Sequence, residues 1–308
     1  MQNCCNEIIN EIEKVIKGKN EVVEKILAAI LAGGNILLED TPGVGKTTLS
    51  LAFSKVMSLS YKRAQFTSDV LPSDIIGFSM YNQKTKEFEY REGPIMSNLF
   101  LADEINRTSA KTQSALLEAM EEKKITVDGV TRKLPNPFIV IATQNPVGSA
   151  GTQPLPESQL DRFMICLSIG YPSRENAIEI LKGHFEMTVG DIQTKLSLED
   201  LEKMQKETED IFVHDNIFAY IVDLTEETRQ HENFQLGISP RGSIALLKMA
   251  KAVAYMNKRD YVTADDVRFI FYDTFAHRVL LSTKAKSRGI SKIEALKAVL
   301  DKVKVLRG

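Results

Sequence analysis

Residues 35–48 restrict what this chain can fold into more than any other stretch. The apolar run Ile36–Leu38 predicts a buried strand, a loop of proline and glycine follows it, and the apolar residues after Lys46 recur at helical spacing. A strand, such a loop and a helix are the context that a phosphate-binding loop requires. The strict pattern for this loop has glycine where this chain has Asp40, and an ordinary glycine-rich turn is the alternative interpretation.

The predicted loop carries groups suited to the phosphates of a nucleotide. Its backbone N–H groups would surround a phosphate at a helix N-terminus, where the helix dipole favours negative charge. Lys46 would contact the β- and γ-phosphates, and the Thr47 hydroxyl would bind Mg²⁺. ATP or ADP and Mg²⁺ are therefore the predicted cofactors. The residues expected to contact the nucleotide here are Pro42, Gly43, Val44, Gly45, Lys46, Thr47 and Thr48.

Two carboxylates end the next apolar strand, which is predicted at Asn98–Glu104. Ligands of parallel sheets bind at the carboxyl ends of the strands. Asp103 would therefore face the Mg²⁺ held by Thr47, and Glu104 would polarise the attacking water. The alternative interpretation is that the acidic pair only caps the helix that follows.

Two further predicted strands have polar residues beside them. The strand Phe138–Asn145 ends in an asparagine that can hydrogen-bond the attacking water or the γ-phosphate, although asparagine before proline alone indicates a turn. The strand Phe163–Ile169 follows Arg162. An arginine at such a position is otherwise a surface residue or an ion-pair partner of Asp161.

Four motifs together resemble the AAA+ ATPases, and more closely the MoxR branch of that family. They are Thr41-Pro-Gly-Val-Gly-Lys-Thr47, Leu101-Ala-Asp-Glu-Ile-Asn-Arg107, Ala142-Thr-Gln-Asn-Pro146 and Leu155-Pro-Glu-Ser-Gln-Leu-Asp-Arg-Phe163. In addition, Val15–Gly18 resembles the segment that packs on the adenine, and Ser239–Arg241 resembles the sensor 2 element. The resemblance covers essentially the whole chain in order, and variation at the position of Asp40 is also seen in this branch.

The resemblance implies an ATP-hydrolysing motor that remodels or matures a protein client or a metal-containing complex. It implies that Val15, Ile16 and Gly18 contact the adenine, and that Arg241, in the first turn of a lid helix, reaches back to the γ-phosphate. A cation near a helix N-terminus is unfavourable, which indicates an anionic partner for this arginine. Arg162 would act on the γ-phosphate of a neighbouring subunit, so activity implies a homo-oligomeric ring, a hexamer in this family. Partners in the family often carry von Willebrand factor A domains.

Composition and charge agree with a globular nucleotide-binding protein. The 308 residues suffice for one large domain and one smaller domain. The net charge of −2 gives no electrostatic basis for binding nucleic acid, and no apolar run is long enough for stable membrane insertion. The cysteines, Cys4, Cys5 and Cys166, fit neither a disulfide framework nor a metal site, so we expect a cytoplasmic protein.

The pattern of predicted elements changes near residue 170. Residues 1–170 alternate short β-branched runs with helical patterns, which predicts an α/β domain of the P-loop NTPase type, with helices on both faces of a parallel sheet. In residues 171–308 strand signals are sparse, which predicts a smaller all-helical lid domain. Helix starts within it are predicted after Ser197, Ser239 and Thr263.

Two predicted hairpins interrupt the first domain. Residues 69–93 contain one with its tip near Asn82–Lys86, and residues 124–134 contain another whose Asp128-Gly129 is a strong two-residue turn signal. Both match in position the hairpins with which the MoxR branch and its relatives contact substrate. Surface hairpins without a direct role are the alternative interpretation.

Three other functions remain open at this point. A metal-chelatase motor subunit is the nearest, because it shares the same inserts. A nucleic-acid translocase would need a basic hairpin tip, whereas this tip is Asp128-Gly129, with its basic residues at the hairpin base. A non-hydrolysing nucleotide switch is disfavoured by the presence of Glu104, Asn145 and Arg162.

Overall fold

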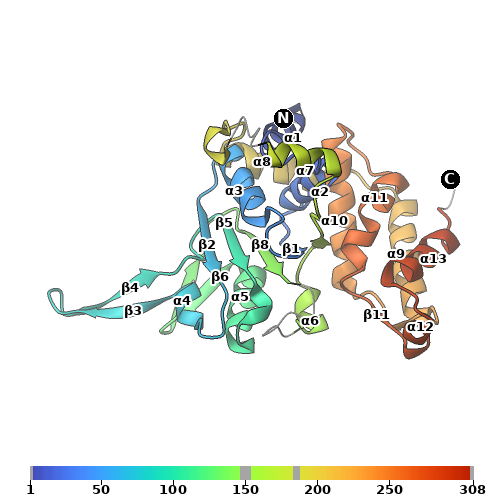
Figure 1. The fold of residues 1–308 in the computed structure, drawn as a ribbon. Helices are drawn as coiled ribbons and strands as arrows, with labels where there is room; N and C mark the ends of the chain where they lie inside the picture. Colours follow the sequence, from blue (N-terminus) through green and yellow to red (C-terminus); the bar gives the residue numbers. More distant parts are fainter. Residues whose placement is uncertain (1–2, 146–153, 183–187, 306–308) are drawn as a thin grey trace.

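The computed structural model describes residues 3–145, 154–182 and 188–305, so Pro146 of the third motif lies outside the described residues. A layered α/β part and a helical part lie side by side (Figure 1). Position 170 as the boundary between two domains remains a prediction.

The central sheet has five strands, all parallel, in the order β2-β5-β8-β1-β9. Four of them lie where the sequence predicts strands. The fifth, β2, has no predicted counterpart, because it is an edge strand whose charged residues conceal the apolar pattern. The bounds are β1 (Ile36–Glu39), β2 (Tyr61–Gln65), β5 (Leu99–Asp103), β8 (Ile139–Gln144) and β9 (Ile165–Leu167).

Helices cover both faces of the sheet, as predicted. Successive strand residues point to opposite faces, so Ile36 and Leu38 belong to one buried cluster and Leu37 belongs to another. The first cluster includes α1 (Asn3–Glu13), α2 (Asn20–Leu31) and α3 (Lys46–Val56), and the second includes α4 (Pro72–Ile76) and α5 (Ala110–Glu122).

Both predicted hairpins are present. The first consists of β3 (Gly77–Asn82) and β4 (Glu87–Glu92), and it projects from the body as an arm (Figure 1). Gly77 at its root has φ +90°, and a Cβ there would lie 2.3 Å from the Arg91 carbonyl oxygen, so only glycine fits. The second consists of β6 (Lys124–Val127) and β7 (Val130–Lys133), joined at Asp128-Gly129, where φ is positive at both residues.

The part after residue 170 is mostly helical. The helix starts after Ser197, Ser239 and Thr263 are confirmed: the two serine side chains accept from helix N–H groups, and at the third start the Asp266 carboxylate accepts from the Thr263 N–H. The prediction of an all-helical lid missed one short antiparallel pair, β10 (Phe234–Leu236) and β11 (Leu280–Leu281), because two or three residues are too few for a strand pattern. The principal helices are α7 (Arg174–Leu181), α8 (Leu198–Glu209), α9 (Asp215–Gln230), α10 (Pro240–Met256), α11 (Ala264–Phe275) and α13 (Lys292–Lys302).

The helical part shares its core with one face of the sheet. A single buried cluster extends from Cys5 in α1 to Val299 in α13. Polar contacts reinforce the junction: the Lys25 ammonium in α2 lies 2.6 Å from the Asp273 carboxylate in α11. Among the described helices, none is long and apolar enough to cross a membrane.

Candidate functional site

The loop between β1 and α3 has the geometry of a phosphate-binding loop. Gly43 and Gly45 have φ of +88° and +95°, and Gly45 is the residue before the first turn of α3. Positive φ at these two glycines is the conformation with which such a loop can direct its amides to a phosphate ahead of a helix N-terminus. The buried Lys46 donates a hydrogen bond to the Asp40 carbonyl oxygen at 2.7 Å. Burial lowers the pKa of Lys46, while the Asp40, Asp103 and Glu104 carboxylates act in the opposite direction.

A cavity of about 580 Å³ lies beside this loop. Of the residues predicted to contact nucleotide, those that line it are Val15, Ile16, Gly43, Val44, Gly45 and Thr48. Gly18 lies beside the cavity and not in its lining. A Cβ at Gly18 would lie 2.1 Å from the side chain of Asn176, which lines the cavity. Pro42 is exposed on the loop, and Thr47 is half-buried in the first turn of α3.

One wall of this cavity was not predicted from the sequence. It consists of Ile169, Gly170 and Pro172 in the linker after β9, with Asn176 and Glu179 of α7. The sequence does contain a feature from which this wall could have been predicted. The break at residues 171–172 follows a strand that is parallel to β1 and adjacent to it. The segment after β9 must therefore start at the same edge of the sheet as the phosphate-binding loop.

The carboxyl ends of β5 and β8 bring Asp103, Glu104 and Asn145 together. The Asp103 carboxylate accepts a hydrogen bond from the Thr143 hydroxyl at 2.6 Å. That hydroxyl also accepts one from the Glu104 N–H at 2.9 Å. The Asn145 amide donates to the Glu104 carboxylate at 2.8 Å, and Arg107 lies 2.9 Å from the other carboxylate oxygen. Thr143 thus joins both acids, a role that the sequence did not indicate.

Two features of the structure agree with the roles predicted for Glu104 and Asn145. Glu104 has φ +58° and ψ +47°, a left-handed conformation that costs a non-glycine residue about 1–2 kcal/mol. Residues in such conformations concentrate at functional sites. The amide oxygen of Asn145 is buried and has no hydrogen-bond partner among the described residues. A buried acceptor beside a carboxylate is suited to hold a water molecule.

Thr47 and Asp103 fit the Mg²⁺ that the sequence predicts. A hydroxyl and a carboxylate are the hard oxygen ligands that Mg²⁺ prefers, and Mg²⁺ usually binds through one or two protein oxygens together with phosphates. The second Asp103 oxygen lies 2.6 Å from the Arg63 guanidinium of β2. Within the described ranges, no group of three or more His, Cys, Asp or Glu residues could hold a metal ion.

Arg162 and Arg241 lie together, away from the phosphate-binding loop. Both contact the Glu121 carboxylate of α5, Arg162 at 2.7 Å. Arg162 precedes β9, so it lies at the amino edge of the parallel sheet, whereas Lys46 and Asp103 lie at the carboxyl edge. The 13 residues of α5 span roughly 20 Å between these edges. The expected reach of Arg241 to its own γ-phosphate is therefore not seen in this conformation.

Asp161 does not pair with Arg162, its neighbour in sequence. Its carboxylate accepts hydrogen bonds from the Ser239 hydroxyl at 2.8 Å and the Arg278 guanidinium at 2.9 Å. The Arg278 side chain is only 2% exposed and also donates to the carbonyl oxygens of Phe163 and Met164. Burial lowers the pKa of Arg278 to about 10, although Asp161 opposes the shift. Arg278 and Ser239 thus hold the segment that carries Arg162 against the helical part.

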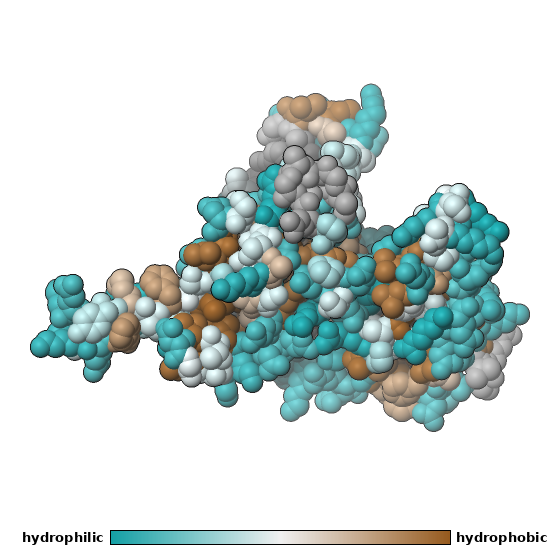
Figure 2. Space-filling view, turned by 90° about the horizontal axis from the view of Figure 1, so that it is seen from below, coloured by the Kyte–Doolittle hydropathy of each residue, from teal (hydrophilic) through white to brown (hydrophobic). Residues whose placement is uncertain are grey.

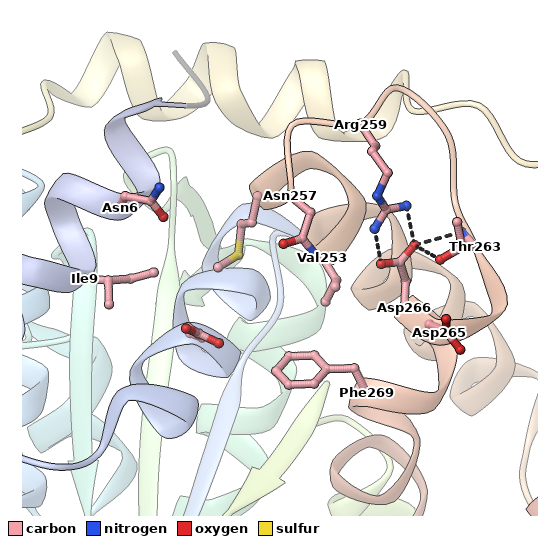
Figure 3. A pocket seen from close by; sticks show the side chains of 11 residues that line it. Asn6, Ile9, Val253, Asn257, Arg259, Thr263, Asp265, Asp266 and Phe269 are labelled. Carbon is pink, nitrogen blue, oxygen red and sulfur yellow. Dashed lines mark hydrogen bonds and ion pairs between the residues drawn. The ribbon is translucent and has the colours of Figure 1, made fainter.

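A second cavity, of about 540 Å³, lies between α1, α2 and the α10–α11 corner (Figure 3). Two of its charged groups, Asp266 and Arg259, are structural partners of each other. The Asp266 carboxylate accepts from the Thr263 backbone N–H at 2.7 Å as part of a capping box, and it also pairs with Arg259. Phe269 points into the space from α11 (Figure 3). The contacts of Asp266, Thr263 and Arg259 thus form the cap of α11 and need no ligand.

Comparisons with known proteins agree with this geometry. The family model for the ATPase family associated with various cellular activities (AAA) matches residues 35–165, and the AAA lid domain model matches residues 226–299. The chain is 49% identical to the uncharacterized protein YeaC of Bacillus subtilis, over 96% of this chain and 93% of that protein. It is 39% identical to Chaperone MoxR1 of Mycobacterium tuberculosis, over 96% and 80% of the two chains.

The solved structures give the same result. A crystal structure from Cytophaga hutchinsonii, described provisionally as an ATPase, superposes with a TM-score of 0.92 at 38% identity, covering 99% of this chain and 96% of that one. Fold and site together define an AAA ATPase, an enzyme that binds and hydrolyses ATP. Within that class, the chain belongs to the MoxR family.

Thr143→Val tests the junction between the two acids. The change keeps the shape of a fully buried side chain but removes the hydroxyl that contacts both Asp103 and the Glu104 N–H. We expect the free energy of unfolding to fall by about 1–3 kcal/mol, because a buried polar group loses its partner. Urea unfolding measures this. Thr126→Val is the control, because its hydroxyl contacts Thr131 on the exposed hairpin, and an equal loss in both variants would contradict the expectation.

Proposed function

We propose that this ATPase is a chaperone-like remodeller that works as a homo-oligomeric ring, a hexamer, with each hydrolysis site shared between two subunits. The observation that carries the proposal is the separation of one set of catalytic groups onto two edges of the sheet. Glu104, Asn145 and Asp103 lie at the carboxyl edge, whereas Arg162 and Arg241 lie at the amino edge. A ring joins unlike edges of successive subunits, so it would bring the two halves together.

The carboxyl edge supplies the groups for attack of water on the γ-phosphate. Lys46 and the loop amides neutralise the phosphates, and Thr47 with Asp103 would hold Mg²⁺, which stabilises charge on the phosphate oxygens. Glu104 accepts the proton of the attacking water as general base. Asn145 positions both partners, because its amide nitrogen contacts the Glu104 carboxylate while its unpaired oxygen accepts from the water. The bond between the γ-phosphorus and ADP then breaks.

The amino edge supplies two cations that their own subunit cannot use at that distance. Arg162 and Arg241 share Glu121, so they are oriented as a pair. About a third and a half of their side-chain surfaces are exposed, which leaves both accessible to a neighbouring subunit. An arginine supplied in trans stabilises charge that develops on the transferred phosphoryl group. The sequence assigned Arg241 to its own subunit, whereas the geometry supports a role beside Arg162.

The projecting hairpin is the proposed contact with a protein client or with a partner that carries a von Willebrand factor A domain. Phe78, Met80, Tyr81 and Phe88 are exposed on it, and the rings of the last two lie 5.4 Å apart. Figure 2 shows apolar and polar residues mixed along this arm. Exposed apolar groups of this kind mark protein interaction sites. The relative named Chaperone MoxR1 supports the same class of activity.

The alternatives receive less support from the described residues. At the base of the second hairpin, where a translocase would use basic residues, Arg132 instead lies 4.0 Å from the Tyr90 ring centre and donates to the Val130 carbonyl oxygen. A metal-chelatase motor subunit would share the nucleotide site and differ in its partner. A neighbouring gene for a von Willebrand factor domain would favour the remodeller, and a porphyrin-pathway neighbour would favour the chelatase.

Glu104→Gln tests the general base. We expect ATP binding to persist while hydrolysis falls by about two orders of magnitude or more, because a positioned base contributes that much. Phosphate release and nucleotide titration measure the two quantities. Glu226→Gln on the exposed side of α9 is the matched control and should hydrolyse ATP at the unmodified rate. Turnover by Glu104→Gln at the unmodified rate would exclude Glu104 as the base.

Mixing inactive variants tests whether Arg162 acts across a subunit boundary. Arg162→Ala and Glu104→Gln proteins should each be nearly inactive, since an arginine finger contributes about 10³–10⁵ in rate. In an equal mixture about a quarter of the interfaces combine an intact base with an intact arginine, so ATPase activity should return. Mixing Lys46→Ala with Glu104→Gln is the control and should give no return, because both residues belong to one edge. No return in the first mixture, with mixed rings verified by mass, means that Arg162 acts within its own subunit.

The double substitution Tyr81→Ser, Phe88→Ser tests the client surface. Basal ATP hydrolysis should stay within about twofold, because the arm lies outside the nucleotide site, while suppression of aggregation of heat-unfolded citrate synthase should be lost. Ile293→Ser, a similarly exposed apolar residue on α13, is the control and should retain suppression. Binding of DNA with steep salt dependence, lost in the double variant, would instead favour a translocase.

A further inference from the structure

Asp40 departs from the phosphate-binding loop pattern, and its side chain has a specific set of partners. The residue follows β1 and is only 6% exposed. Its carboxylate accepts three hydrogen bonds: from the Ser168 hydroxyl at 2.7 Å, the Ile169 N–H at 2.6 Å and the Gly170 N–H at 3.1 Å. Hydrogen bonds to an ionised acceptor are about twice as strong as neutral ones. Asp40 therefore fastens the segment that leaves β9 to the end of β1.

The segment held by Asp40 is a wall of the nucleotide cavity. Ile169 and Gly170 line that cavity together with Val15 and Ile16, the residues predicted to contact the adenine. The next residue of the segment is fixed as well. Lys19 donates to the Tyr171 carbonyl oxygen at 2.8 Å, and the Thr41 hydroxyl lies 3.2 Å from the Tyr171 hydroxyl. The wall is thus held by Asp40 and Thr41 of the loop and by Lys19, which precedes α2.

Asp40 contacts the phosphate-binding lysine through its backbone and not through its side chain. Its backbone carbonyl oxygen, not its carboxylate, accepts the hydrogen bond from Lys46. A glycine at this position could provide that carbonyl equally well. It could not provide the carboxylate, so the Ile169 and Gly170 amides would lose the acceptor that they have here. The side chain of Asp40 therefore binds the wall, while its backbone carbonyl binds Lys46.

We propose that the Asp40 carboxylate is a positioning residue for the nucleoside end of the bound nucleotide. By fixing residues 168–170 it sets how tightly the cavity holds the base and ribose, whereas its charge near Lys46 acts alike on every ligand that carries the phosphates. The proposal rests on the nucleotide site proposed above and deepens it. It also gives a reason for aspartate in a position that the general loop pattern assigns to glycine.

The test compares two ligands that share only the phosphates. ATP uses the loop and the wall, whereas inorganic tripolyphosphate uses the loop alone. Calorimetric titration of each ligand in Mg²⁺ buffer gives two dissociation constants for each variant, and their ratio reports the nucleoside end. Loss of a negative charge near Lys46 acts on both ligands alike, so the ratio is insensitive to it. In Asp40→Asn we expect the preference for ATP over tripolyphosphate to fall about tenfold, as for a lost hydrogen bond to a charged group.

Two further variants keep the test decisive. Ser168→Ala removes one neutral donor to the Asp40 carboxylate without changing charge. It should lower the preference for ATP over tripolyphosphate about threefold, so it tests the role of Asp40 even if Asp40→Asn does not fold. Glu39→Gln removes the neighbouring carboxylate, on the opposite face of β1, and should leave the ratio unchanged.

The outcomes separate this inference from the proposed function. An unchanged ratio in folded Asp40→Asn and Ser168→Ala proteins would overturn the inference, as would an equal fall in Glu39→Gln. If the unmodified protein bound neither ligand, the nucleotide site itself would be wrong. If it bound ATP and the ratio did not respond to these substitutions, only the role of Asp40 would fail.

Discussion

The parallel alignment of β5, β8 and β1 determines where the functional groups of this protein can lie. Because the strands run in one direction, their carboxyl ends meet at one edge, and each next residue along the chain emerges there. Asp103 and Thr143 follow the paired residues Ala102 and Ala142, which is why a single hydroxyl can contact both acids. The same direction sends everything that precedes a strand to the opposite edge. Arg162 is there for that reason alone, since it comes just before β9.

The junction between sheet and helical part depends on buried charge. Arg278 and Asp161 form an ion pair inside the protein, where removing two charges from water is costly unless further hydrogen bonds complete their coordination. Here they do: the guanidinium also reaches backbone carbonyls on both sides of the junction, and Ser239 supplies a second donor to Asp161. Such an arrangement tolerates few alternative positions. It fixes the segment carrying Arg162 and the start of α10, which carries Arg241, relative to each other.

Much of the fold could be predicted from sequence, because its signals are local. The apolar runs that become β1, β5, β8 and β9 are bounded by loops, and the turn at Asp128-Gly129 has its own chemistry. The strand β2 could not be recognised, since an edge strand needs few apolar residues. Likewise, β10 and β11 are too short to leave a pattern.

The residues of the candidate site likewise fall into those that the sequence could predict and those that it could not. Lys46, Asp103 and Glu104 belong to motifs of consecutive residues, so the sequence alone could predict them as site residues. Thr143 and Arg278 could not, because each acts through residues more than 35 positions away that only folding brings near. The role of Arg241 stays a prediction for a related reason: a motif names a residue, but the side of the sheet to which it belongs depends on how the helical part packs.

The left-handed backbone conformation of Glu104 has a consequence for the evolution of this protein. A glutamate in a left-handed conformation is a poor choice for folding, and glycine or asparagine would suit that backbone better. Selection for stability alone would therefore drive glutamate out of this position, while selection for turnover would retain it. A descendant that no longer hydrolysed ATP would drift toward glycine there and become harder to unfold. On the general-base role proposed for Glu104, the residue at position 104 therefore indicates from sequence whether a lineage still hydrolyses ATP.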